Sequence, residues 1–194
     1  FCRSLSTFLA GNLHVAVDSK VLATEQVTYD EFIRSLPYPA ILGIYSMNPL
    51  EGNALIELNP TLVFLIIDRL LGGTGIEIPK NRDLTEIERK IISGRLSKIV
   101  KLMNEAWADI FALDVSLINM ETNPQFTQIV APNEMVVVIT IEVKIGEAKG
   151  MINICIPYIV MKPILDKLNS LLFFSSQKKE ISAEERELVR KKIE

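Results

Sequence analysis

"GNALIELNPTLVFLIIDRL", residues 52–70, decides the fold, because the chain repeats its pattern 98 residues later as "GMINICIPYIVMKPILDKL", residues 150–168. The two stretches align without a gap, and Ile56 falls on Ile154. An ungapped match of this length indicates one strand–helix unit that is used twice. We therefore expect an α/β domain with a pseudo-twofold internal repeat, in which strands of both halves share one central region.

The remaining elements follow from hydrophobic periodicity and from turn residues. The strands before each repeat unit, 40–45 and 138–143, are in register at the same shift. The predicted elements are a helix within residues 1–19, strands at 40–45 and 54–58, a helix from Asn59 to about Leu71, a helix from Thr85 to about Ile110, strands at 114–121, 135–145 and 150–156, and a helix at 158–172.

The long central helix has the clearest start signal. Thr85 followed by Glu88 three residues later forms a capping box. The residues that the spacing places on one apolar side are Ile87, Ile91, Ile92, Ile99, Met103, Ala106 and Ile110. The Val- and Ile-rich run 135–145 alternates only weakly, so we expect a strand that is buried on both faces.

Composition excludes several classes of protein. A net charge of −3 and a pI of about 5.4 do not fit a nucleic-acid partner, which would need a basic patch. The apolar runs are far shorter than the roughly 20 residues of a membrane span, so we expect a soluble chain. Cys2 and Cys155 lie far apart, which favours a reducing, cytoplasmic setting without disulfides or a metal site.

The ends suggest a piece of a longer protein, since the chain opens on Phe1. We expect one domain at 1–172, built from half-repeats at about 1–78 and 84–172. Residues 173–194 would form a mobile linker, at 174–181, and a charged helix. That helix is either a connector to a further domain or a short solvated helix.

Residues that could carry catalysis are scarce. His14 is the one histidine, and a lone histidine beside Leu13 and Val15 is typical of a structural position. No spacing of His, Cys or carboxylates matches a metal site, and no nucleophile motif is present. We expect no cofactor.

A glycine cluster ends the first repeat unit, "GGTG" at residues 72–75. It is not a phosphate-binding loop, because it follows the end of a helix, where carbonyls rather than N–H groups are exposed. We expect Gly72 or Gly73 to cap the helix in a left-handed conformation, and Gly75 to allow a second reversal. The end of the second repeat unit, which reads "NSLL" from Asn169, has no glycine. A short loop without side-chain bulk favours contact with a partner protein.

Several long motifs carry a resemblance to a known family. "NPTLVFLIIDRLLGGTG", "LTEIERKI", "ETNPQFTQIVAPNEMVVVITIEVKIGE" and "GMINICIPY" resemble the middle domain of the FliM family of flagellar motor switch proteins, over roughly residues 1–172. The resemblance implies a three-layer α/β/α fold related to the chemotaxis phosphatases CheC and CheX. It also implies a non-enzymatic scaffold in the cytoplasmic ring at the base of the flagellar motor, peripheral to the inner membrane.

The resemblance further implies partners. In the family the middle domain packs beside copies of itself and holds the rotor protein FliG, and other segments bind phosphorylated CheY and FliN. The signal carried by phosphorylated CheY then changes the direction of rotation. Family members contact FliG through a Gly-Gly-x-Gly loop that usually has Pro at the third place, where this chain has Thr74. The residues that we assign to FliG binding are Asp68, Arg69, Gly72, Gly73, Thr74 and Gly75.

The alternative function is dephosphorylation of CheY, because CheC and CheX share the fold. Their helices carry a Glu-x-x-Asn pair that orients a water molecule. Alignment of the helix start "LTEIERKIISGRLS" places Gly94 and Ser97 at those two positions, and the first helix contains no glutamate. We therefore expect no phosphatase activity, and we expect Gly94 to serve close helix packing.

Overall fold

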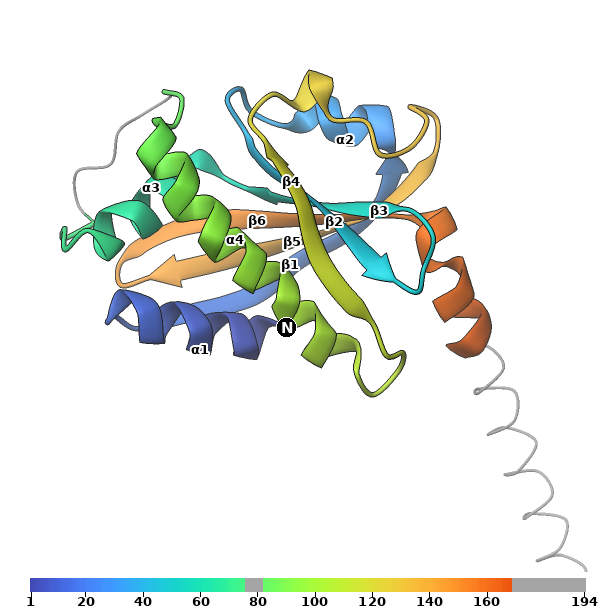
Figure 1. The fold of residues 1–194 in the computed structure, drawn as a ribbon, viewed down its shortest axis with the longest axis horizontal. Coiled ribbons are helices and arrows are strands. Elements are labelled where there is room, and N and C mark those ends of the chain that lie inside the picture. The colour runs from blue at the N-terminus through green and yellow to red at the C-terminus, as the bar shows by residue number, and fades with distance from the viewer. Residues whose placement is uncertain (76–81, 169–194) are drawn as a thin grey trace, which may run out of the picture. The chain divides into compact units, whose positions relative to one another are not determined.

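Residues 1–75 and 82–168 are described by a computed structural model of the chain (Figure 1). Residues Phe1–Val160 form one compact unit, and the chain from Met161 onward forms a second. The elements are α1 (Cys2–Leu13), β1 (Val17–Thr28), α2 (Tyr29–Ser35), β2 (Ile41–Asn48), β3 (Asn53–Leu58), α3 (Pro60–Leu70), α4 (Glu86–Trp107), β4 (Asp114–Glu121), the short 3-10 helix η1 (Pro124–Phe126), β5 (Met135–Ile145) and β6 (Ala148–Pro157).

One six-stranded sheet runs through the first unit, in the order β1-β5-β6-β3-β2-β4. All neighbouring strands are antiparallel. The hairpins β2–β3 and β5–β6 meet at the centre, where β3 pairs with β6. The first strand of each half pairs with a strand of the other half: β1 pairs with β5, and β4 pairs with β2. The expected pseudo-twofold repeat is therefore confirmed.

Helices lie on both faces of the sheet. On one face α1, α3 and α4 contact one another, and α4 crosses in front of the central strands in Figure 1. A Cβ atom on Gly43 of β2 would lie 2.8 Å from Leu96 Cδ2 of α4. On the other face Tyr29 and Phe32 of α2 pack in a cluster with Leu42 of β2. The expected three-layer arrangement is present, with a thin layer on the α2 side.

The predicted helix starts are confirmed in detail. The Asn59 side chain accepts a hydrogen bond from the Thr61 N–H at 2.9 Å, and Pro60 occupies the first turn of α3. At α4 the capping box of Thr85 and Glu88 is formed in both directions. The two helices that flank the repeat boundary thus begin where their sequences specify.

The first helix lies within the expected range, but the strand that follows it was not predicted. α1 ends at Leu13, where His14 takes a left-handed conformation with φ 51°. β1 then occupies Val17–Thr28. Because β1 is an edge strand with mostly exposed side chains, it lacks the apolar alternation from which a strand is usually predicted.

Two burial predictions were wrong. Ile87 is 73% exposed. The buried side of α4 instead consists of Ile92, Leu96, Ile99, Val100 and Met103. β5 is not buried on both faces, because its side chains alternate between buried and half-buried positions. α2 covers one face of β5 only at Val136 and Val138. On the opposite face Ile139 lines a hollow beside the start of α1 and the end of α4, so neither face is covered along the whole strand.

The helix expected at 158–172 is present as far as residue 168. The rest of that helix, the linker at 174–181 and the charged helix up to residue 194 lie outside the described residues.

Candidate functional site

The glycine loop begins where α3 stops. The Leu71 N–H donates to the Ile67 carbonyl at 3.0 Å, and the Gly72 N–H donates to the Arg69 carbonyl at 3.1 Å. Gly72 has φ +90°, so it is the left-handed residue expected at the end of this helix. The Gly73 N–H then returns to the Asp68 carbonyl at 2.8 Å. The last turn of α3 is closed by the loop itself.

Asp68 closes the loop a second time, through its side chain. The Gly75 N–H donates to Asp68 Oδ2 at 2.7 Å, and Gly75 has φ +74°. Gly73 is needed for a different reason, because a Cβ atom there would overlap the Asp68 carboxylate. The three glycines therefore serve two backbone reversals and one close approach, and all three act on the same loop.

The outer side of the loop is bare. Leu71 is 71% exposed, and Thr74 is also exposed. A Cβ atom on Gly72 would meet no atom within 4 Å. The exposed surface is mostly backbone beside one large apolar side chain, which fits a protein contact better than a site for chemistry.

Arg69 lies on the inner side of the loop. Its Nε is buried and has no hydrogen-bond partner among the described residues. A Cβ atom on Gly75 would lie 3.0 Å from Arg69 Nε, and one on Gly146 would lie 3.8 Å from Arg69 Nη2. Gly146 forms the β5–β6 turn and donates its N–H to Ala16 at 2.9 Å. The loop of the first half therefore lies beside a turn of the second, and no local sequence signal indicates this contact.

The helix positions of the alternative phosphatase site are on the surface. Gly94 and Ser97 line an open hollow of about 580 Å³ between α4 and β4, together with Arg89 and Lys90. No carboxylate is among its lining residues. A Cβ atom on Gly94 would have no neighbour within 4 Å. The expectation that Gly94 serves close helix packing was therefore wrong.

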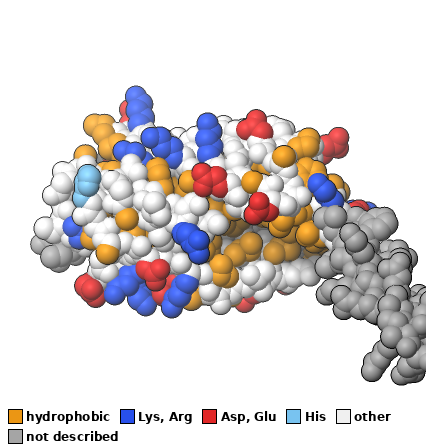
Figure 2. Space-filling view, turned by 90° about the horizontal axis from the view of Figure 1, so that it is seen from below, with side chains coloured by type: hydrophobic (Ala, Val, Ile, Leu, Met, Phe, Trp, Pro, Cys, Tyr) orange, Lys and Arg blue, Asp and Glu red, His pale blue; other side chains and the backbone are white. Residues whose placement is uncertain are grey.

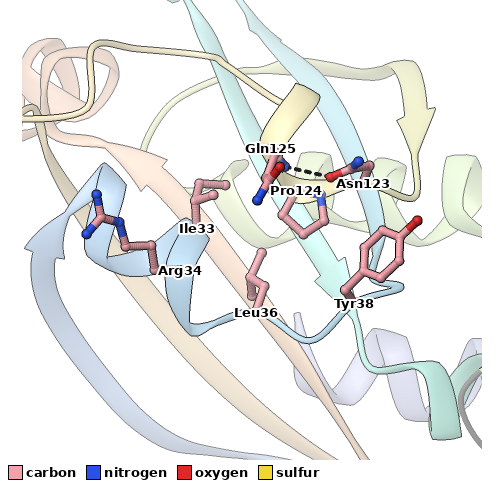
Figure 3. A pocket seen from close by; sticks show the side chains of 7 residues that line it. All are labelled: Ile33, Arg34, Leu36, Tyr38, Asn123, Pro124 and Gln125. Atoms are coloured by element: carbon pink, nitrogen blue, oxygen red, sulfur yellow. Dashed lines mark hydrogen bonds between the residues drawn. The ribbon is translucent and has the colours of Figure 1, made fainter.

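A second cleft lies between α2 and η1 and measures about 440 Å³ (Figure 3). Its lining residues are Ile33, Arg34, Leu36, Tyr38, Asn123, Pro124 and Gln125. The hydrogen bond drawn there joins the Gln125 N–H to Asn123 Oδ1 at 2.9 Å and closes the turn of η1. The one ionisable side chain with charge at neutral pH, Arg34, is paired with Asp30 at 3.0 Å. This cleft has no acid–base pair for catalysis.

A third hollow, of about 270 Å³, is almost wholly apolar. It lies between the start of α1, the end of α4 and the sheet, and Figure 2 shows apolar side chains gathered in a hollow on this side of the molecule. Its lining residues are Phe1, Cys2, Val21, Met103, Ala106, Trp107, Ile110, Ile139, Ile141, Ile154 and Ile156. It lacks convergent polar groups that could orient a substrate.

One acidic side chain is buried in the described part of the chain. Glu57 is 1% exposed, and Asn153 Nδ2 donates to its Oε2 at 2.8 Å. Thr140 Oγ1 in turn donates to Asn153 Oδ1 at 2.8 Å. Burial raises the pKa of Glu57 to about 7, although the bond from Asn153 opposes this change. Glu57 of β3 is paired with Asn153 of β6, so this buried hydrogen bond connects the two halves of the domain.

The described residues offer little to metals or membranes. Among residues 1–75 and 82–168 no group of three or more His, Cys, Asp or Glu could hold a metal ion. Within the same ranges no helix has both the length and the apolar character needed to cross a bilayer. His14 ends α1, which is the structural role expected of it.

The pseudo-twofold sheet with helices on both faces defines a class of fold. The chain shares its fold with the chemotaxis protein CheX from Vibrio vulnificus, at a TM-score of 0.52 and 14% identity over 79% of this chain and 93% of that one. At this identity the likeness concerns the fold alone. The fold is of the CheC-like α/β type.

The chain belongs to the family of the flagellar motor switch protein FliM, whose family model matches residues 1–173. A FliM from Treponema pallidum is 44% identical over the whole chain. The structure is similar to a chain in the FliG–FliM complex from H. pylori, with a TM-score of 0.81 and 33% identity over 85% of this chain and 91% of that one. The chain spans 56% of the length of the Treponema relative.

Proposed function

We propose that the chain is a non-enzymatic scaffold of the flagellar motor switch, which binds FliG through residues 72–75 and packs beside copies of itself. The observation that carries the proposal is the exposed, internally braced glycine loop at the end of α3. A related domain, 33% identical, occurs in a complex of FliG with FliM. Membership of the FliM family supports the same role.

The loop geometry supports a protein contact in physical terms. Residues 72–75 present backbone and little side-chain bulk, so a partner surface can approach closely. The exposed Leu71 beside them adds apolar surface that a partner would bury. Gly72, Gly73, Thr74 and Gly75 are the proposed contact residues, with Asp68 and Arg69 as part of the same site.

The assignment as a non-enzyme rests on the missing catalytic pair. Gly94 has no functional group, and Ser97 stands where the CheC and CheX phosphatases carry an amide. The α4–β4 hollow over these residues is lined by Arg89 and Lys90 but by no carboxylate. Without an acid and an amide to orient water, hydrolysis of phosphorylated CheY has no catalyst here.

The wider assembly forms part of the proposal. Residues 1–172 would act as the middle domain in the cytoplasmic ring of the flagellar basal body, peripheral to the inner membrane. Contacts with phosphorylated CheY and FliN would involve segments mostly outside residues 1–194. The scaffold would pass the CheY signal to FliG and so change the direction of rotation.

Titration calorimetry with FliG, beside thermal melts, tests the proposal. We expect Gly73→Arg to abolish binding while the domain stays folded, because the new side chain displaces the Asp68 carboxylate and fills the space of the partner. Gly11→Arg is the matched control, since Gly11 is an exposed glycine of α1 with no atom within 4 Å of a Cβ. Normal binding by Gly73→Arg would reduce the loop to a helix cap. Loss of folding would mean that the glycines serve the fold and that FliG binds elsewhere.

A further inference from the structure

Two charged residues, Asp68 and Arg69, precede the glycine loop. The side chains of both turn inward, toward the loop and the protein interior, and not toward solvent. Asp68 Oδ2 accepts from the Gly75 N–H, and the Arg69 Nε is buried next to Gly75. A residue that contacts a partner through its charge would instead present that charge to solvent. The geometry therefore separates these two side chains from the exposed backbone that follows them.

We propose that Asp68 is a positioning residue: its carboxylate holds residues 72–75 in the one conformation that FliG recognises, and it does not itself touch FliG. This inference rests on the proposed function of the loop. The family resemblance groups Asp68 with residues 72–75 as contacts of FliG. The inference separates them: residues 72–75 contact FliG, and Asp68 holds them in place.

The loop needs such a brace. With three glycines among four residues, it has more conformational freedom to lose than an ordinary turn. Asp68 accepts two hydrogen bonds from the loop. The Gly73 N–H donates to its backbone carbonyl, and the Gly75 N–H donates to its carboxylate. Thr74 makes no hydrogen bond to another described residue, so nothing else on the loop replaces this closure. Ordering a loop before it binds reduces the entropy that binding must overcome.

The bond that closes the loop is of the stronger kind. The acceptor is an ionisable carboxylate, and the 2.7 Å distance fits a charge-assisted hydrogen bond. A Cβ atom on Gly73 would overlap that carboxylate, so the glycine and the aspartate fit together as a pair. The requirement for glycine at residue 73 is explained without any reference to FliG.

The internal repeat provides a comparison within the same chain. Asp166 is the repeat equivalent of Asp68 and lies in the helical residues 158–168. Asp166 is exposed and is followed by "KLNS" rather than by a glycine loop. It therefore provides a control substitution of the same residue type at the equivalent place.

The test combines two readouts on four variants of the whole chain. NMR hydrogen exchange of the Gly75 amide reports closure of the loop, and calorimetric titration reports FliG affinity. The variants are Asp68→Ala, Asp68→Asn, Asp68→Ala combined with Thr74→Pro, and Asp166→Ala. The amide oxygen of Asn can still accept from Gly75, whereas Ala cannot. Pro at residue 74 restricts the loop through its fixed φ and removes no observed hydrogen bond.

We expect Asp68→Ala to lose the Gly75 protection and to weaken FliG binding by about ten- to a hundredfold, the range for loss of a charge-assisted bond. Asp68→Asn should keep both properties within about fivefold, and Asp166→Ala should change neither. Thr74→Pro should recover at least part of the affinity lost in Asp68→Ala, a rescue that a direct contact would not show.

Two results would overturn the proposal. In one, Asp68→Asn keeps the Gly75 protection but binds as weakly as Asp68→Ala, which would make the charge itself the contact. In the other, Asp68→Ala loses Gly75 protection but binds FliG normally. If the unmodified chain does not bind FliG while Gly75 stays protected, the proposed function fails, and the brace is shown to serve some other purpose.

Discussion

Ile56 and Ile154, which are equivalent in the 98-residue repeat, pair directly with each other in the β3–β6 ladder. The pseudo-twofold axis therefore passes between these two residues. The neighbouring pair Glu57 with Asn153 is related by the same axis to the pair Cys155 with Leu55. One side of the axis is polar and the other apolar, so the two halves share a backbone plan but not a core.

Separation of the halves should abolish folding. Residues 1–78 lose β5 as the partner of β1, and residues 84–172 lose β2 as the partner of β4. Each piece retains a two-stranded hairpin, which is marginal in water without further strands. We expect each fragment to be unfolded by circular dichroism and by NMR, and an equimolar mixture to regain structure. A fragment that melts cooperatively by itself would contradict this.

Removal of the Glu57 carboxylate should alter how stability depends on pH. The folded-state pKa of about 7 lies above the ordinary value of 4.5, so the folded state holds its proton where the unfolded state has lost it. The stabilising contribution is present below pH 4.5 and is lost as the pH rises to 7. The free energy of unfolding should fall by roughly 3 kcal/mol across that window because of this group.

Urea unfolding at several pH values provides the measurement. Glu57→Gln keeps an oxygen acceptor for Asn153 but cannot ionise, so its unfolding free energy should lack this fall and should exceed that of the unmodified chain at pH 8. Glu25→Gln, on the exposed part of β1, controls for the loss of a surface charge. Parallel pH profiles for the unmodified chain and Glu57→Gln would refute the assignment.

The repeat and the capping residues predicted most of the fold. Asn59 and Thr85 set the helix starts correctly, because side-chain capping is a local interaction that three or four residues specify. β1 was missed because its partner is β5, more than a hundred residues away, and an exposed edge strand needs no apolar alternation. The apolar side of α4 was misjudged at Ile87, because an apolar residue in the first turn of a helix fits the periodic pattern whether or not it is buried.

The loop was predicted as a site, but its internal brace was not. Glycine spacing indicates reversals, and Gly72 and Gly75 provide them. The bond from Gly75 to Asp68 spans seven residues and depends on the exact path of the turn, which composition does not encode. The Gly146 turn beside Arg69 belongs to the other half and is brought there only by the tertiary fold.

Phosphorylated CheY should decay at its own rate in the presence of this chain. Gly94 and Ser97 provide no carboxylate and no amide, and the hollow above them is open to solvent. Phosphate release measured with and without the chain checks this, and Ser97→Ala should give the same rate. Acceleration that disappears in Ser97→Ala would show that the scaffold assignment is wrong.

Two glycine-to-alanine substitutions should change stability in opposite directions. Gly94 lies in the middle of α4 with open space around it, so Ala should stabilise the domain by about 0.5–1 kcal/mol through helix propensity. Gly150 of β6 is buried, and a Cβ atom there would lie 2.5 Å from Leu62 Cβ and 3.1 Å from Leu62 Cα. Because that second atom is backbone, α3 itself must shift, and we expect a loss of about 1–3 kcal/mol.

Thermal melts of the two variants test the packing of α3 on β6. The expected shift is about 2 °C upward for Gly94→Ala and several degrees downward for Gly150→Ala, given about 2–4 °C per kcal/mol for a domain of this size. Leu62→Ala combined with Gly150→Ala should recover little, because Ala keeps the Cβ atom, the nearest neighbour at 2.5 Å, as well as the Cα. Full recovery would show that the Leu62 atoms beyond Cβ, and not the path of α3, require glycine at residue 150.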